Sequence, residues 1–113
     1  MKDSLSFKLE IFCPKEDVEA MLEVLAAAHA GEIGNYDHCA SIIDVRGTYR
    51  PLPGSHPAVG EVEHLFTGSE CKIEVNCRAE YLTECIRMVR EAHRYEEPVI
   101  NVIPLANQQF GGT

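Results

Sequence analysis

Three of the five histidines in this 113-residue chain, together with nearby carboxylates, could bind a metal ion. Imidazole nitrogens, carboxylate oxygens and thiolates are the donors that divalent transition metals prefer in proteins. These histidines show neither the i,i+4 spacing of a helical site nor a CxxC-type spacing. A divalent-metal site stays open as an alternative, with four candidate ligands: His38, His64, His93 and Glu97.

One cysteine and two glutamates are candidates for catalysis, Cys39, Glu61 and Glu97. Cys39 directly follows His38, and consecutive side chains of a strand point to opposite faces, so the two do not form a nucleophile–base pair. Glu61 and Glu97 each have a carboxylate close by in sequence, but such pairs in an acidic protein are usually solvated. No glycine-rich phosphate-binding motif is present. The sequence therefore favours a non-enzymatic protein and assigns no catalytic residue.

Composition restricts the partners of this chain. Its formal charge is −8, and a field of that sign repels the phosphates of nucleic acids. No apolar run approaches the roughly 20 residues of a membrane helix, and the first residues alternate in polarity where a signal peptide would be apolar. Five cysteines without a CxxC motif indicate reduced thiols. We expect a cytoplasmic protein that binds neither nucleic acid nor membrane.

The secondary structure follows from an internal repeat. The pattern Lys-x-Glu-x-x-Cys at residues 8–13 recurs 64 positions later, at residues 72–77. In each copy apolar residues first alternate, as in a half-buried strand, and then recur at helical spacing. A β-rich run follows each copy, at residues 39–46 and 99–103. The order βαββαβ predicts an α+β, ferredoxin-like two-layer sandwich with both helices on one face of a four-stranded antiparallel sheet.

The domain boundaries follow from the same pattern. Residues 1–105 form a single ferredoxin-like domain, and residues 106–113 form a C-terminal tail. The glycine- and proline-rich stretch 47–69 is expected to be a long inter-strand loop. A connection of that length in a compact domain is usually functional or used in assembly.

The sheet face opposite the helices is expected to be partly apolar. The alternation assigns five residues to this face: Phe12, Ala40, Ile42, Ile100 and Val102. A second copy of the chain could cover part of such a face.

Three sequence blocks, at a turn, in the long loop and after the second helix, form a further pattern. They are residues 34–39 (GNYDHC), residues 47–63 (starting GTYRP and ending GEVE) and residues 92–98 (AHRYEEP). In this order they resemble the YqfO-type domain of the NGG-interacting-factor-three (Nif3-like) family, which occurs as an insertion in larger proteins and as short stand-alone chains. The last block also resembles the His-x-Tyr-Glu-x-Pro segment of CutA.

The resemblance implies a CutA/PII-like architecture and a homotrimer whose subunits meet through sheet edges and the loop. It does not imply hydrolase activity, because the dinuclear metal centre of the larger proteins belongs to their surrounding domain. Arg94 stands where the motif usually has proline, which implies a less rigid turn.

The resemblance also implies a candidate pocket at the subunit boundary. Eleven positions carry over: Asn35, Tyr36, His38, Cys39, Thr48, Arg50, Pro51, Glu61, Tyr95, Glu96 and Glu97. The resulting hypothesis is a non-enzymatic, trimeric module of CutA/PII-like type that binds a small ligand or acts in regulation. Its expected partners are copies of itself and a small molecule, or a metal ion.

Overall fold

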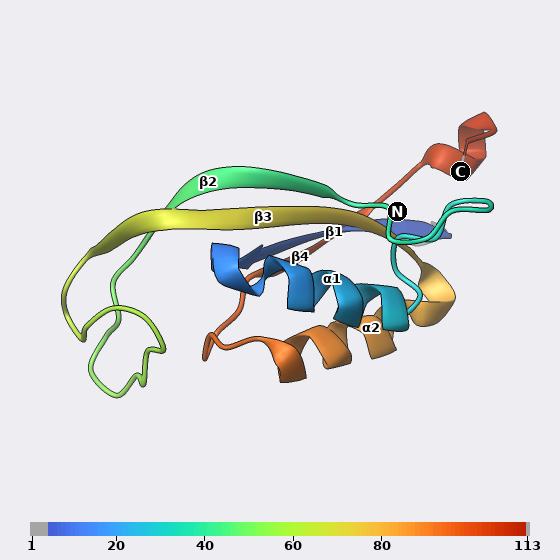
Figure 1. Ribbon diagram of the computed structural model, residues 1–113. Helices are drawn as coiled ribbons and strands as arrows, with labels where there is room; N and C mark the ends of the chain where they lie inside the picture. The colour runs from blue at the N-terminus through green and yellow to red at the C-terminus, as the bar shows by residue number, and fades with distance from the viewer. Residues whose placement is uncertain (1–4, 113) are drawn as a thin grey trace.

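A computed structural model describes residues 5–112 and shows two layers, a four-stranded antiparallel sheet and a pair of helices (Figure 1). The strands lie in the order β2-β3-β1-β4. The elements are β1 (Ser6–Cys13), α1 (Val18–Ala27), β2 (Ser41–Tyr49), β3 (Phe66–Arg78), α2 (Ala79–Ala92) and β4 (Ile100–Pro104), with 3-10 turns η1 (Lys15–Asp17) and η2 (Asn107–Phe110). The predicted ferredoxin-like α+β fold is confirmed.

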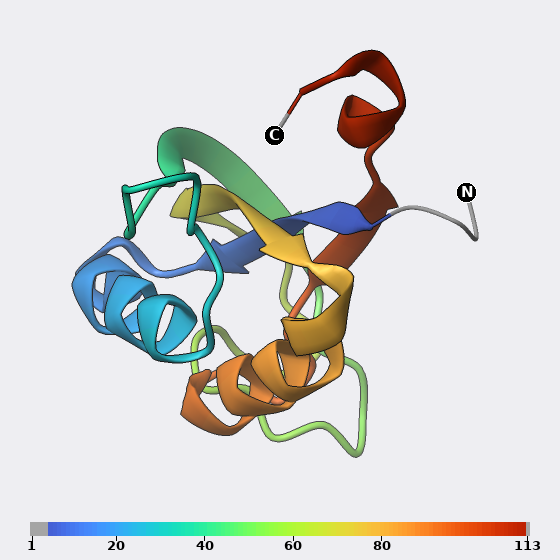
Figure 2. The same cartoon turned by 90° about the vertical axis from the view of Figure 1, so that its right-hand side faces the viewer.

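The core lies between one face of the sheet and both helices (Figure 2). The register pairs Leu9 with Val75 and Ile11 with Ile73, so that apolar side chains of the two central strands meet on the helix side. This is the alternation that the sequence shows in both copies of its repeat. Four helix residues complete the buried layer: Met21, Leu25, Cys85 and Val89.

Arg94 connects the segment after α2 to the 3-10 turn η1 that precedes α1. Its guanidinium donates from Nε and Nη2 to the Asp17 carboxylate, with both distances 2.6 Å, and a second carboxylate, that of Glu16, lies 3.5 Å away. A forked pair of this kind fixes both partners in orientation as well as distance. The structure shows this ion pair at the turn, and the lower rigidity that the resemblance implies stays a prediction.

The expectation of a partly apolar open face is wrong for Ile42, Ile100 and Val102. Their register partners are the core residues Ile73, Ile11 and Leu9. Residues paired across neighbouring strands share a face, so these three lie on the helix side near the two sheet edges.

Charged residues of β1 and β3 occupy the open face instead. Lys72 lies 3.2 Å from Glu74 and 3.7 Å from Glu10, and Lys8 lies 3.3 Å from Glu74. The hydrogen bond from Lys72 holds the pKa of the Glu74 carboxyl below its usual range. Opposite charges thus partner one another across the centre of this face, and Phe12 and Ile43, the register partners of Lys72, are the apolar residues beside them.

Strands β2 and β3 extend further than the sequence predicts. They pair without interruption from Ser41–Glu74 to Tyr49–Phe66 and form a two-stranded ribbon beyond the end of β1 (Figure 1). The buried side of β3 changes at Glu70 and Cys71, which are both buried. The alternation of buried and exposed side chains changes phase there, so the first part of β3 shows no strand pattern in the sequence. The predicted loop 47–69 is therefore too long, and the connection spans residues 50–65.

Four cysteines are buried in the core, and Cys39 is partly exposed. Burial raises the pKa of the Cys13 thiol to about 11, with further contributions from Cys71 and acidic neighbours. Neither helix among residues 5–112 has the length and apolarity needed to cross a bilayer.

One thiol per folded chain, that of Cys39, is expected to react rapidly with the disulfide reagent DTNB. The thiolate is the attacking species, and burial disfavours both its formation and its access to the reagent. Absorbance of the released thiolate at mildly alkaline pH measures the fast phase. The Cys39→Ser variant should lack that phase, and all five thiols should react after unfolding in guanidinium. Two or more fast thiols in the folded protein would contradict this burial.

Candidate functional site

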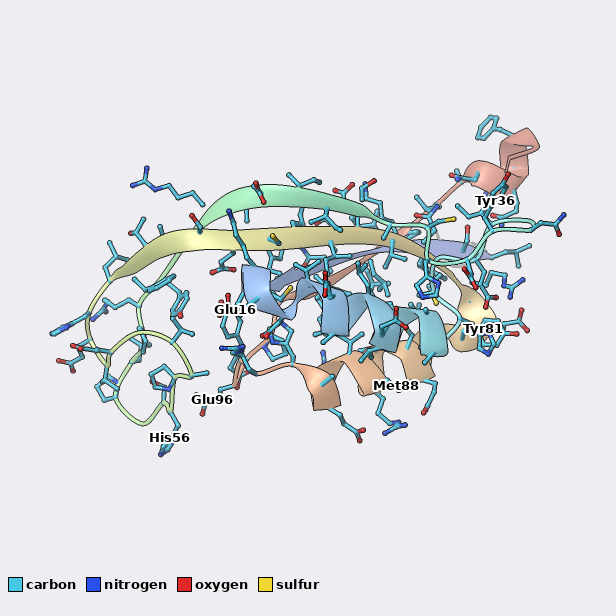
Figure 3. The ribbon with its side chains drawn as sticks, in the orientation of Figure 1. Glu16, Tyr36, His56, Tyr81, Met88 and Glu96 are labelled. Carbon is cyan, nitrogen blue, oxygen red and sulfur yellow. The ribbon has the colours of Figure 1, made fainter. Side chains whose placement is uncertain are left out.

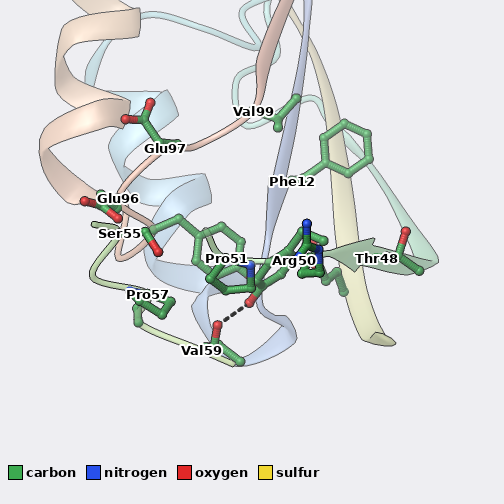
Figure 4. A pocket seen from close by; sticks show the side chains of 15 residues that line it. Phe12, Thr48, Arg50, Pro51, Ser55, Pro57, Val59, Glu96, Glu97 and Val99 are labelled. Atoms are coloured by element: carbon green, nitrogen blue, oxygen red, sulfur yellow. Dashed lines mark hydrogen bonds between the residues drawn. The ribbon is translucent and has the colours of Figure 1, made fainter. Parts of the chain in front are cut away.

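A pocket of about 510 Å³ lies under the β2–β3 ribbon, where the loop 50–65 folds back towards the end of α2 (Figure 4). Apolar and aromatic groups dominate its wall, with a few charged side chains. The lining residues are Phe12, Gly47, Thr48, Tyr49, Arg50, Pro51, Ser55, Pro57, Ala58, Val59, Glu70, Tyr95, Glu96, Glu97 and Val99. A concave, mostly apolar site with a few polar groups is typical of small-molecule binding.

Aromatic rings form one wall of this pocket. Tyr49 stacks on Phe66 with ring centroids 4.8 Å apart and meets Tyr95 edge-on at 6.2 Å. The Tyr49 hydroxyl donates to the carbonyl of Val59, the dashed contact in Figure 4, and so attaches the loop to the ribbon. Burial raises the pKa of both tyrosines, and the nearby Glu70 charge adds to this. Both phenols therefore stay protonated at neutral pH.

His93 positions Tyr95. It is 8% exposed, its Nε2–H donates to the carbonyl of Phe12 at 2.7 Å, and its Nδ1 accepts from the backbone N–H of Tyr95 at 3.1 Å. These two bonds require the neutral tautomer and leave no ring nitrogen free. His93 is thus a structural residue that ties the end of α2 to β1, which excludes it as a metal ligand in this arrangement.

The loop closes over the pocket through contacts to the segment after α2. The backbone N–H of His56 donates to Glu96 at 2.8 Å, and the N–H of Glu63 donates to the carbonyl of the buried Pro51 at 2.6 Å. Figure 3 shows His56 and Glu96 at the same end of the molecule. Backbone bonds of this kind hold the loop in one shape without regular secondary structure.

Glu70 is the one buried carboxylate among the described residues, with 6% of its surface exposed. No side chain or backbone group of residues 5–112 forms a hydrogen bond or ion pair with it. A β-carbon at Gly47, diagonally across the ribbon, would lie 2.7 Å from Glu70 Oε1, so the carboxylate rests directly on the bare backbone there. A buried carboxylate without a partner is costly, and its presence in a pocket is a functional signal.

The first sequence block lies at the other end of the molecule, whose long axis measures 48 Å. Backbone bonds between Ile33 and Tyr36 close a two-residue turn at Gly34–Asn35, and Tyr36 is 75% exposed. Figure 3 shows Tyr36 at the opposite end from His56 and Glu96. A shallower hollow of about 330 Å³ beside this turn is lined by Glu32, Gly34, Asn35, Tyr36, Asp37 and Arg78.

The structure thus brings together six of the eleven positions that the resemblance implies. Those in the pocket are Thr48, Arg50, Pro51, Tyr95, Glu96 and Glu97. Those elsewhere are Asn35, Tyr36, His38, Cys39 and Glu61. Within one chain the expected single pocket is therefore split between two ends. Sequence analysis missed Glu70 and Tyr49, although Gly47, the glycine that makes room for Glu70, is visible in the sequence.

The four candidate metal ligands do not come together in one chain. His38 contacts Asp37 at 2.9 Å and Glu23 at 3.2 Å, and the hydrogen bond that its ring donates to Asp37 raises the pKa of this imidazole. His64 instead pairs with Glu61 at 2.9 Å. Across residues 5–112, no three histidine, cysteine or carboxylate side chains form a group that could hold a metal ion. The predicted arrangement is thus wrong for a single chain.

Comparisons with known proteins show which proteins this chain is similar to. No family model matches the sequence. It is 33% identical over 102 residues to the GTP cyclohydrolase 1 type 2 homolog of Halalkalibacterium halodurans, covering 90% of this chain and 27% of that protein. The chain thus spans about a quarter of the length of the curated relatives it matches.

Comparison with solved structures also finds a similarity to part of a longer protein. A Bacillus cereus protein related to NIF3 superposes with a TM-score of 0.79 at 32% identity, over 92% of this chain and 26% of the other. The PII-like protein CutA from Nostoc sp. PCC 7120 superposes at 0.66 with 16% identity, over 91% and 84%, and shows the fold alone. The chain is therefore a homologue of a segment of Nif3-related proteins and has the CutA/PII-like fold, which confirms its resemblance to the YqfO-type domain.

Proposed function

We propose that the protein is a non-enzymatic, homotrimeric module that binds a small ligand in the pocket under the β2–β3 ribbon and acts in regulation. The observation that carries the proposal is the pocket itself, an apolar cavity of about 510 Å³ that contains an unpaired buried carboxylate. The CutA/PII-like fold supports a binding or regulatory module. The five free cysteines support a location in the reducing cytoplasm.

The polar groups of the pocket favour binding over catalysis. The Ser55 hydroxyl donates to the carbonyl of Leu52 at 2.7 Å and forms no hydrogen bond to a basic side chain of residues 5–112. Glu96 is engaged by the backbone of His56. No histidine or cysteine belongs to the fifteen lining residues, all of which lie in the described part of the chain. A nucleophile paired with its base is therefore missing from this pocket.

A cyclic trimer would reunite the separated sequence blocks. In a heterologous ring, one end of each subunit contacts the opposite end of the next. Such a contact would bring the turn at Tyr36 towards the loop of a neighbour. Both ends expose large apolar side chains, with Leu52 and Leu65 on the loop and Tyr36 on the turn. Burial of these groups has to outweigh the repulsion between three copies of charge −8.

Sedimentation equilibrium at low micromolar concentration tests the assembly. We expect a species with three times the 12.6 kDa of one chain, and more of it at higher salt, because salt screens the repulsion. The Tyr36→Asp and Leu65→Asp variants should each shift the equilibrium towards monomer, since they place a charge in the proposed contact. Thr83→Asp, on the exposed surface of α2, adds the same charge and should leave it unchanged. Monomer alone in the unmodified protein would overturn the trimer.

A further inference from the structure

The chemistry of the pocket identifies a class of ligand. We propose that the pocket binds a small organic cation, whose N–H groups donate to the Glu70 carboxylate while its apolar body lies against Tyr49 and Tyr95. The inference rests on the proposed binding function and narrows it. A metal ion fits less well, since hard cations need several oxygen ligands and Glu70 alone among the described groups is buried and unpaired here.

The balance of charge in the pocket favours a cation. Three of its lining residues are acidic, Glu70, Glu96 and Glu97, and one is basic, Arg50. Glu96 already accepts a hydrogen bond, whereas Glu70 accepts none from residues 5–112. Charge-assisted N–H donors to a buried carboxylate are among the stronger polar contacts in proteins. A cationic ligand would thus supply both the charge and the donors that Glu70 lacks.

The position of Glu70 depends on Gly47. A β-carbon at position 47 would come within 2.7 Å of Glu70 Oε1 and 3.0 Å of its Cδ, so only glycine leaves the carboxylate in place. The register partner of Gly47 is also a glycine, Gly68. Two facing glycines weaken a strand pair, since they add no side-chain contact. Here Gly47 provides the space that the Glu70 side chain occupies, and Gly68 provides space for the Phe66 ring.

The aromatic wall suits the rest of such a ligand. Tyr49 and Tyr95 both line the cavity, and their rings meet at 6.2 Å with their planes at 61°. The face of an aromatic ring attracts a cation electrostatically, and more so where water is excluded. Phe12, Pro51 and Val59 add apolar surface for a non-polar substituent. The pocket therefore combines a carboxylate with an apolar, aromatic wall.

Three probes of one shape and different charge test the inference: benzylammonium, benzyl alcohol and benzoate. Each is titrated at neutral pH into the full chain, with binding followed by shifts of backbone amide signals in ¹H–¹⁵N NMR. We expect benzylammonium to bind about tenfold more tightly than benzyl alcohol and to shift Gly47 and Glu70. Benzoate should bind most weakly, because the unpaired carboxylate repels it.

Glu70→Gln should remove the preference for benzylammonium and leave the affinity for benzyl alcohol unchanged. Glu19→Gln, on the exposed surface of α1 and outside the pocket, makes the same charge change and should retain the preference. Gly47→Ala is the second variant, since it displaces the carboxylate without altering the charge of the chain. Circular dichroism confirms that each variant is folded, and Gly47→Ala replaces Glu70→Gln if the latter does not fold.

The outcomes separate the two proposals. Equal affinities for the three probes, tighter binding of benzoate, or a preference that survives both Glu70→Gln and Gly47→Ala would overturn the cation class and leave the binding function standing. No shift in the pocket with any probe at millimolar concentration would overturn the binding function together with the cation class.

Discussion

The Ile73→Ala variant is expected to lose about 3 kcal/mol of its free energy of unfolding. Ile73 is fully buried at the centre of β3, where it pairs with Ile11 of β1 and lies beneath both helices. Truncation to alanine removes three carbon atoms from the best-packed part of the core and leaves a cavity there. A loss of this size is a large fraction of the stability of a small domain.

Urea unfolding followed by circular dichroism measures the loss. The matched control is Ile43→Ala, which makes the same truncation on β2, on the opposite face and beside Lys72, where the side chain is 38% exposed. That control should cost less than about 1 kcal/mol, since less apolar surface is removed from contact. Equal losses would contradict the strand register, because a shift of one residue exchanges the two faces.

The Gly31→Ala variant is expected to lose about 2 to 4 kcal/mol. Gly31 ends the segment after α1 with φ at +80°, a region that side chains other than that of glycine rarely adopt. A β-carbon there would lie 2.8 Å from the carbonyl oxygen of Cys39 and 3.0 Å from its nitrogen. Those atoms belong to the backbone, so they cannot move as a flexible side chain could.

Gly31 also holds two segments together. Its N–H donates to the carbonyl of Asn76 in β3 at 2.8 Å, and its carbonyl accepts from the N–H of Cys39 at 2.9 Å. Any shift that relieves the clash at position 31 weakens both bonds. The turn that carries Asn35 and Tyr36 would therefore lose its attachment to the sheet.

Thermal unfolding compared with Gly34→Ala measures this effect. Gly34 also has positive φ, at +55°, but nothing lies within 4 Å of a β-carbon there. The control should cost about 1 kcal/mol, the penalty of the left-handed conformation alone. A Gly31→Ala variant no less stable than Gly34→Ala would contradict the close approach of Cys39 to Gly31.

The elements of this fold are largely predictable because local periodicity encodes them. The alternation around Leu9 and Ile11, and its copy around Ile73 and Val75, reports one buried sheet face directly. The helices follow from the apolar stripes that cover that face. Such patterns depend on residues close in sequence, and the strands and helices therefore lie close to where the sequence indicates.

Prediction failed where burial departs from a single alternating face. At Glu70 and Cys71 the buried side of β3 changes, and the polar stretch before them gives no strand signal, although it pairs with β2. Ile100 and Ile42 lie at the sheet edges, where the face of a short apolar run depends on its register with β1 and β3. Register is set by contacts between distant segments, which no local pattern contains.

The amino-acid order alone was enough for the fold class, the strand and helix sequence, and the blocks that resemble the YqfO-type domain. The tertiary structure decided which residues of those blocks lie together. Tyr95 and Glu96 lie at the loop, whereas Tyr36 lies at the far end of a 48 Å molecule. It also buried Glu70 over Gly47, a juxtaposition that arises only when β2 and β3 pair in the register that sets Gly47 opposite Gly68. A binding pocket depends on distances between such segments, and these distances come from packing and register, which act over the whole chain.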